Sequence, residues 1–226
     1  MARTGARRTK NPDDGNEGLV MPNYPVIVGF LGLAAAGKTT AAKAVEMDMQ
    51  HRGVPVHWMP MARRLKAGLK SFGITKEEHK DIYRHLAQFI GTDVLREHDA
   101  DWWVNLWQED VEMILETYQN KPCVILVDDI RFLNELEAVR HYDYITMFIH
   151  GVTRLDLDQE LYKHESEQFA LGITQRYLKK PTLVLTEIDY VVDNKPTTLK
   201  EHFELKVATD VARAYSVLRE LREQQK

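Results

Sequence analysis

The sequence predicts an α/β fold, a three-layer sandwich with a five-stranded parallel sheet flanked by helices on both faces. Three observations support this prediction. Residues 24–31 form an apolar, β-branched run that passes through a glycine-rich turn into the helix-forming sequence 40–47. Residues 124–127 form an unbroken apolar run, which is typical of a strand buried on both faces of a parallel sheet. Further strand-like runs, each separated by helical patterns, lie at 54–59, 144–149 and 188–192.

The composition favours one globular domain. The chain has 226 residues, 44% of them hydrophobic, and its net charge of -4 gives no global reason to expect a nucleic-acid or membrane partner. No apolar run reaches membrane-spanning length. The single cysteine, Cys123, excludes an internal disulfide framework and favours a reducing cytoplasm. Because Cys123 precedes the apolar run at 124–127, we interpret it as a buried structural thiol.

Two segments fall outside the regular pattern of strands and helices. We expect residues 1–22 to form a disordered tail and residues 23–226 to form a single domain. The tail begins with basic residues, so a basic arm that touches nucleic acid is an alternative. The segment 151–180 is polar and rich in cations, Arg154 among them. Its position after a strand suits a mobile lid over phosphates, and a surface helix is the alternative.

The turn after the first strand matches the phosphate-binding pattern G-x-x-x-x-G-K-[ST] from Gly32 to Thr39. Glycine permits backbone angles that a Cβ would forbid, so successive N–H groups converge on a phosphate at the positive end of the new helix. Lys38 would reach the β- and γ-phosphates of a nucleotide, and the Thr39 hydroxyl would hold Mg²⁺. The residues predicted to bind the nucleotide here are Gly32, Ala34, Ala35, Ala36, Gly37, Lys38, Thr39 and Thr40.

Acidic and basic side chains follow the buried run at 124–127. Asp128 and Asp129 lie where an acid would meet the Mg²⁺ of the phosphate loop, and Arg131 would project into the same crevice. The planar guanidinium of arginine suits phosphate oxygens because it donates to them in pairs and stays charged.

The region at about 60–120 is predicted to be helical. A capping box, Thr75-Lys76-Glu77-Glu78, opens one helix, and an amphipathic pattern predicts another over 103–118. Arg64 and Lys66 suit either a second anionic group or a solvated helical turn. The apolar stripe of the first helix consists of Leu86, Phe89, Ile90 and Val94. A second capping box at 198–201 opens a long C-terminal helix.

Over roughly residues 24–205, the chain resembles the deoxynucleoside monophosphate kinases of tailed bacteriophages. The resemblance rests on the phosphate loop and on five later segments in the same order: Ala62-x-x-Leu65-Lys66, Leu86-x-Gln88-x-x-Gly91-Thr92-Asp93 running into Asp101-Trp102-Trp103-Val104, Asp129-x-Arg131-x-x-x-Glu135, His164-Glu165-Ser166-Glu167, and Asn194. It implies the P-loop kinase fold, with acceptor-binding and lid insertions at about 60–120 and 151–180.

The resemblance also implies ATP-dependent phosphorylation of a deoxynucleoside monophosphate, with Mg²⁺ as cofactor. Lys38, Asp129 and Arg131 would act in catalysis, Arg154 would approach ATP, and Thr39, Asp128 and Asp129 would hold the metal. The residues that the resemblance places around the acceptor are Lys66, Gln88, Asp93, Trp103, Arg131, His164, Ser166 and Glu167. Arg64, Arg96 and Trp102 lie in the same segments and are further candidates for acceptor contacts. Arg64 and Trp102 depart from the family pattern near the acceptor, so the resemblance does not assign the base.

Two other functions are compatible with the sequence. Related phage phosphate-loop kinases phosphorylate 5-hydroxymethyluracil within DNA, and a basic arm with a tryptophan cluster would suit that polymer. A nucleotide-dependent binding switch that transfers no phosphoryl group is the third hypothesis. We expect the protein to act without a membrane, in the cytoplasm of an infected bacterial host, with a homodimer among the possible assemblies.

Overall fold

The computed structural model describes residues 24–151, 164–180, 188–194 and 200–223. Its strands form one five-stranded sheet in the order β2-β3-β1-β4-β5, and every neighbouring pair is parallel. This arrangement confirms the predicted fold class. The strands are β1 Pro25–Leu31, β2 Val56–Trp58, β3 Cys123–Ile130, β4 Tyr144–His150 and β5 Tyr190–Asp193.

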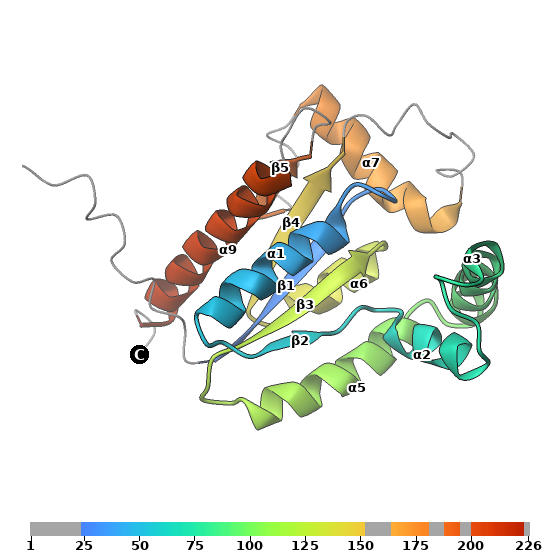
Figure 1. Cartoon of the computed structure of the whole chain (residues 1–226), viewed down its shortest axis with the longest axis horizontal. Coiled ribbons are helices and arrows are strands. Elements are labelled where there is room, and N and C mark those ends of the chain that lie inside the picture. The colour runs from blue at the N-terminus through green and yellow to red at the C-terminus, as the bar shows by residue number, and fades with distance from the viewer. Residues whose placement is uncertain (1–23, 152–163, 181–187, 195–199, 224–226) are drawn as a thin grey trace, which may run out of the picture.

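Helices connect the strands and cover both faces of the sheet (Figure 1). They are α1 Lys38–His51, α2 Arg63–Ser71, α3 Lys80–Gln88, the π-helix η1 Phe89–Val94, α4 Leu95–His98, α5 Trp102–Thr117, α6 Leu133–Arg140, α7 Glu165–Lys179 and α9 Lys200–Glu223.

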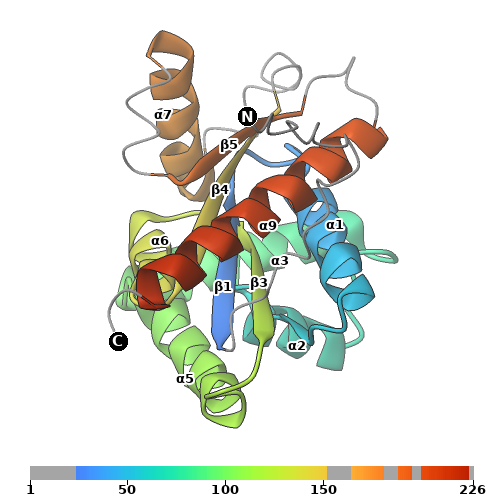
Figure 2. The ribbon, with the colours of Figure 1, turned by 90° about the vertical axis from the view of Figure 1, so that its left-hand side faces the viewer.

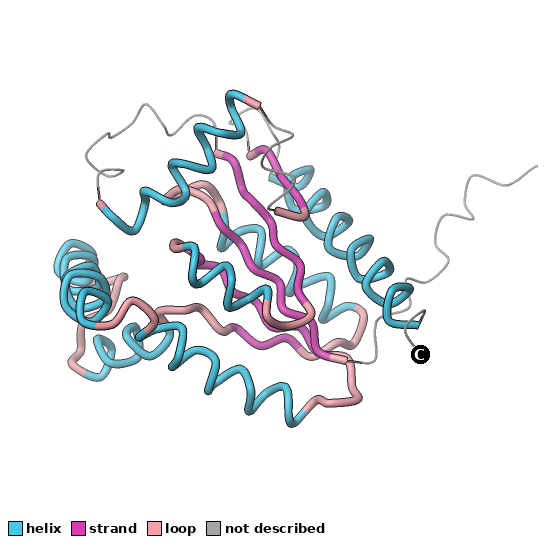
Figure 3. The backbone as a smooth tube through the Cα atoms, turned by 180° about the vertical axis from the view of Figure 1, so that it is seen from behind, coloured by secondary structure: helices cyan, strands magenta, loops and turns pink. Residues whose placement is uncertain are grey.

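The central strand β1 sends alternate side chains into two separate cores because successive residues of a strand point to opposite faces. Val26, Val28 and Phe30 pack with apolar residues of α1 and α9. Ile27 and Leu31 pack on the other face, with residues of α5, α6 and α7. The views in Figures 2 and 3 show α1 and α9 together on one side of the sheet and α6 on the opposite side. The domain therefore has three layers.

The carboxyl ends of all five strands meet at one edge of the sheet. The Gly32–Thr39 turn follows β1 at the centre of that edge, Arg131 follows β3, and Asn194 follows β5. The helices α2, α3 and α7 lie at the same end of the molecule (Figure 1). In open α/β sheets, ligands bind in the crevice outside the carboxyl ends of the strands.

One predicted helix start is wrong. Thr75 closes a turn, since its Oγ1 accepts a hydrogen bond from the Glu78 N–H at 3.3 Å and its carbonyl accepts one from His79 at 2.9 Å. The helix itself begins at Lys80. The hydrogen bond from the Glu78 N–H to the Thr75 side chain is present, but it closes a single turn that ends before α3 begins.

The apolar stripe over 86–94 is also wrong in part. Leu86 and Ile90 pack against a small core around Leu65, whereas Phe89 and Val94 are 48% and 43% exposed. For Val94 the cause is η1, whose π-helical i→i+5 bonding widens the turn and rotates later residues away from the face that an α-helix would present. Phe89 is the first residue of η1, so this widening does not account for its exposure. Periodicity at 3.6 residues cannot anticipate this change.

Other predictions agree with the structure. The helix predicted over 103–118 is α5, and Cys123 is buried at the start of β3, where burial raises the pKa of its thiol to about 12. The tail at 1–22, Arg154 with most of the first half of the predicted lid, and Thr198 lie outside the described residues. Among the helices of the described part, none is both long and apolar enough to cross a membrane.

Candidate active site

The turn between β1 and α1 has room for backbone but little else. Gly32 adopts φ +143°, and a Cβ at this position would lie 2.4 Å from the carbonyl oxygen of Ile149 on β4. Gly37 adopts φ +107°, and a Cβ there would lie 2.5 Å from the Asn194 side-chain nitrogen. Asn194 also donates a hydrogen bond of 2.8 Å to the carbonyl of Ala36. The loop is thus held against β4 on one side and the end of β5 on the other.

The start of α1 is suited to an anion. Gly37 precedes the helix without a side-chain cap, and the first turn of α1 carries no acidic residue. The first N–H groups of a helix have no partner within it, and the helix dipole adds positive potential at this end. A phosphate at the loop would meet both.

Lys38 is buried and folded back on the loop. Its Nζ donates to the carbonyls of Gly32 and Leu33 at 2.6 and 2.9 Å. Burial, together with the nearby Arg131 charge, lowers the pKa of Lys38 to about 8, although the carboxylates of Glu167, Asp129 and Asp128 oppose that shift. Burial is the main cause of this shift, and a phosphate bound nearby would oppose it by favouring the ammonium form.

The two carboxylates at the end of β3 face different partners. Asp128 accepts a hydrogen bond of 2.7 Å from the Thr39 hydroxyl. Asp129, predicted as a second metal ligand and a catalytic residue, is instead engaged from the α2 side, by the N–H of Met61 at 2.7 Å and by Lys66 Nζ at 2.8 Å. Adjacent residues of a strand point to opposite faces, which explains the separation.

The Asp129–Lys66 pair stays ionised. Burial would raise the pKa of the Asp129 carboxyl, but the Lys66 ammonium and the Arg131 charge outweigh it, and the pKa lies below its usual value. Burial likewise opposes the charge on Lys66, and the Asp129 carboxylate raises the pKa of Lys66 despite it. The Lys66 side chain is 42% exposed, so it can meet an incoming anion as well.

Thr39 and Asp128 are suitable Mg²⁺ ligands. In the described part of the chain, no group of three or more His, Cys, Asp or Glu side chains forms a metal cage. Mg²⁺ is commonly bound by one or two carboxylates together with substrate phosphates, so it does not need such a cage. The contact between a hydroxyl and a carboxylate at the loop fits that pattern.

Arg131 faces the first turn of α7. Its Nη1 donates to Glu167 Oε1 at 2.7 Å and to Ser166 Oγ at 3.3 Å. Glu167 Oε2 accepts a hydrogen bond of 2.8 Å from the N–H of Ala34 in the loop. The structure therefore brings Arg131, Ser166 and Glu167 to the phosphate loop, from elements far apart in the sequence.

A buried ion pair supports the turn that carries Arg131. Glu135 accepts from the backbone N–H of Arg131 at 2.7 Å and from the Arg96 guanidinium at 2.5 Å. Arg96 also donates to the Ala100 carbonyl, and its guanidinium lies 3.7 Å from the centre of the Phe132 ring. Burial raises the pKa of Glu135 to about 7, while the Arg96 charge opposes that rise.

Several residues predicted around the acceptor point elsewhere. Arg64 forms ion pairs with Asp110 and Glu109 of α5. Arg96 is buried in its pair with Glu135 and meets no open surface. Trp103 is 7% exposed, and its indole N–H donates to the carbonyl of Gly91 at 2.8 Å. These three side chains hold the helical region together.

Other predicted acceptor residues remain accessible. Asp93 is exposed on η1, Gln88 and Trp102 are half-buried, and Asp93 Oδ1 lies 3.7 Å from His164 Nε2. His164 caps α7, because its Nδ1 accepts a hydrogen bond from the Ser166 N–H at 3.2 Å. The first turn of α7 thus contacts η1, Arg131 and the loop at once.

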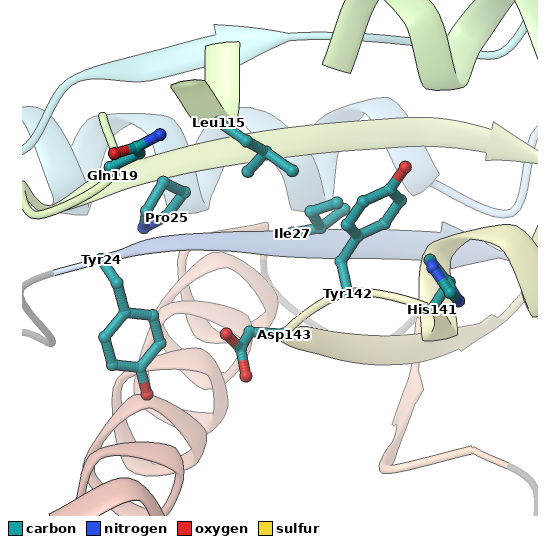
Figure 4. A pocket seen from close by; sticks show the side chains of 8 residues that line it. All are labelled: Tyr24, Pro25, Ile27, Leu115, Gln119, His141, Tyr142 and Asp143. Atoms are coloured by element: carbon teal, nitrogen blue, oxygen red, sulfur yellow. The ribbon is translucent and has the colours of Figure 1, made fainter. Parts of the chain in front are cut away.

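A cavity of about 480 Å³ lies far from this site, at the amino end of β1 and so at the opposite end of that strand from Gly32 (Figure 4). It borders Tyr24, where the described part of the chain begins. Its lining consists of Tyr24, Pro25, Ile27, Leu115, Gln119, His141, Tyr142 and Asp143.

Comparison with known proteins finds only solved structures of similar fold. No protein-family profile matches the chain, and no curated protein matches it. An APS kinase of Mycobacterium tuberculosis, solved with AMPPNP and APS, is 12% identical, with 84% of this chain and 98% of that chain covered and a TM-score of 0.44. The thymidylate kinase of Ehrlichia chaffeensis is 15% identical, with 84% and 98% covered and a TM-score of 0.42. The dephospho-CoA kinase of Campylobacter jejuni is 13% identical, with 85% and 98% covered and a TM-score of 0.39.

Two acids organise this region without a role assigned from the sequence: Asp110 was not recognised, and Glu135 entered only as the end of the segment Asp129-x-Arg131-x-x-x-Glu135. Asp110 carries no motif. Glu135 lies three residues after the helix-capping position of α6, which is where a glutamate accepts from the preceding backbone N–H groups, so its spacing offered a signal.

Replacing Glu135 by Ala should destabilise the protein by about 3–5 kcal/mol, because it leaves the Arg96 charge buried without a partner. Glu137→Ala, an exposed position on the same helix, should cost no more than about 0.5 kcal/mol. Urea unfolding at pH 8, where Glu135 is ionised, measures both changes. Equal effects of the two substitutions would show that the pair contributes little.

Proposed function

We propose that this protein transfers the γ-phosphoryl group of ATP to a deoxynucleoside monophosphate, as the deoxynucleoside monophosphate kinases of tailed bacteriophages do. One observation carries the proposal. The phosphate loop, the Thr39–Asp128 contact and Arg131 converge at the carboxyl edge of one parallel sheet. These parts supply what phosphoryl transfer requires, namely positioning and neutralisation of spreading negative charge.

The donor would bind at the loop. Its phosphates would accept from loop N–H groups and from Lys38, which would leave the carbonyls of Gly32 and Leu33. Thr39 and Asp128 would hold Mg²⁺, and that ion would supply positive charge beside the phosphates when bound. Arg154 remains a proposed lid cation.

The acceptor would bind between the donor loop and the helical region. Lys66 and Arg131 are partly exposed cations on that side, 42% and 39% respectively, and suit the acceptor phosphate. Gln88, Asp93 and Trp102 are accessible for the nucleoside. Asp129 then serves as the residue that positions Lys66 and the start of α2.

Transfer would be an in-line displacement. An oxygen of the acceptor 5′-phosphate forms a bond to the γ-phosphorus, and the bond from that phosphorus to the β–γ bridging oxygen breaks, with its electron pair leaving on ADP. Lys38 and Arg131 would stabilise the charge that develops on the equatorial oxygens. Exclusion of water by α7 and its neighbours would suppress ATP hydrolysis.

Incubation with ATP, Mg²⁺ and a panel of acceptors tests this function. We expect diphosphate formation from at least one deoxynucleoside monophosphate, and Lys38→Ala should lower turnover about 100-fold or more while the fold persists. Lys43→Ala, an exposed change on the same helix, should retain activity. Label transferred only to DNA containing 5-hydroxymethyluracil would identify the alternative acceptor, and hydrolysis without any phosphorylated acceptor would support a nucleotide switch.

Substitution of the two adjacent acids should give different kinetic defects. Asp128→Asn should lower kcat and increase the Mg²⁺ concentration required, with the acceptor KM changed by no more than about twofold. Asp129→Asn should instead raise the acceptor KM about tenfold, because Lys66 loses its partner, and leave the Mg²⁺ requirement unchanged. Steady-state kinetics with Mg²⁺ titrations measures both. If both variants showed the same kinetic defects, Asp129 would be assigned as a metal ligand together with Asp128.

The low pKa of Lys38 predicts proton uptake on donor binding. At pH 8 the group is half protonated in the empty loop, because its pKa is about 8. Nearby phosphates favour the charged form and raise that pKa, so binding of Mg²⁺-ATP should take up about half a proton at pH 8 and almost none at pH 6.5. Calorimetry in buffers of different ionisation enthalpy counts the protons. Equal uptake at both pH values, or proton release, would contradict the assignment.

A further inference from the structure

Glu167 occupies an unusual position for an acid. It lies in the first turn of α7, it is 3% exposed, and both of its carboxylate oxygens are engaged. Oε2 accepts from the Ala34 N–H at 2.8 Å, and Oε1 accepts from Arg131 Nη1 at 2.7 Å. One donor is a backbone amide of the phosphate loop, and the other is the guanidinium that faces it.

These two donors are of the kind that a phosphoryl group uses. Phosphate oxygens in loops of this type accept from backbone N–H groups, and arginine binds the oxygens of the transferring group. Ala34 lies on the first arm of the loop, away from the start of α1, where Gly37 and Lys38 would cradle the phosphates nearer to the nucleoside. A carboxylate between Ala34 and Arg131 therefore lies on the terminal-phosphate side.

Two further observations fit a nucleotide site whose donors are bound by the protein's own groups. Lys38 donates to loop carbonyls rather than toward open space. The α7 turn is held in place by the His164 cap, and it reaches η1 through the contact between His164 and Asp93. A carboxylate and a phosphate cannot share the same donors, since two negative charges at this distance repel each other.

We propose that Glu167 holds the place of the terminal phosphoryl group of ATP in the nucleotide-free protein, so that ATP must displace it and ADP need not. The inference rests on the proposed nucleotide site. Glu167 therefore competes with the terminal phosphate for the same donors, which weakens the binding of triphosphates but not that of diphosphates. When ATP displaces Glu167, the first turn of α7 moves. Because His164 at that turn contacts Asp93, binding of the terminal phosphate also changes the position of η1 on the acceptor side.

Substitution by glutamine separates this role from a purely structural one. Glutamine has nearly the same shape but only one acceptor oxygen, and its NH₂ group cannot accept from Arg131. Glu167→Gln should therefore compete poorly and strengthen binding of a triphosphate. If Glu167 instead orients Arg131 for catalysis throughout, the same change should weaken triphosphate binding or leave the preference between ATP and ADP unaltered.

The experiment measures the dissociation constants of adenylyl imidodiphosphate and ADP, each with Mg²⁺, by calorimetry on the full chain. We expect Glu167→Gln to tighten binding of the triphosphate analogue about tenfold and to change ADP binding by no more than about twofold. Glu165→Gln is the matched control, because it removes the same charge from an exposed position in the same turn, and it should leave both constants unchanged.

The outcomes are distinct. An unchanged ratio of the two constants in Glu167→Gln, or weaker binding of the analogue, overturns the proposal for Glu167 while the nucleotide site stands. Wild-type protein that binds neither nucleotide overturns the proposed function itself. If Glu167→Gln does not fold, Glu167→Asp gives the same comparison. Its shorter side chain cannot reach both donors, so the dissociation constant of the triphosphate analogue should fall relative to that of ADP, and an unchanged ratio of the two constants overturns the proposal.

Discussion

The close fit of the Gly32–Thr39 turn between β4 and the end of β5 fixes the backbone of this turn and limits which side chains can approach it. The Ile149 carbonyl and the Asn194 side chain leave no space for a Cβ at Gly32 or Gly37, so the loop is fixed by its neighbours as well as by its own composition. A fixed loop has fixed N–H directions, and the side chains that approach them must come from elements with equally defined positions. Arg131 and Glu167 meet that requirement through β3 and α7.

Among the described residues of this region, each buried charged group has a partner of opposite charge within ion-pair distance, with Lys38 as the exception. Asp129 is matched by Lys66, and Glu135 by Arg96. Lys38 donates to carbonyl oxygens, and burial together with the Arg131 charge lowers its pKa although nearby carboxylates oppose the shift. Buried charge without compensation is costly, so an anion at the loop would be electrostatically favourable.

Sequence patterns predicted the parts of the site that depend on local geometry. The phosphate loop, the acids after β3 and the helix α5 follow from spacing and periodicity, and each was predicted with useful bounds. The sequence could not predict which groups individual side chains contact, because these contacts depend on packing between elements that are distant in the chain. Arg64, Arg96 and Trp103 looked like candidates for acceptor contacts but pair with α5, Glu135 and η1. The π-helix also escaped prediction, since one added residue in a turn leaves no compositional trace.

The neighbouring positions of Asp128 and Asp129 have a mechanical consequence. One peptide bond of β3 separates the acid that contacts the phosphate loop from the acid that contacts α2. Because consecutive Cα atoms are held about 3.8 Å apart across a trans peptide bond, the spacing of these two backbone anchors stays nearly constant. Under the proposed function, any approach of acceptor toward donor would therefore come from elements that move relative to β3.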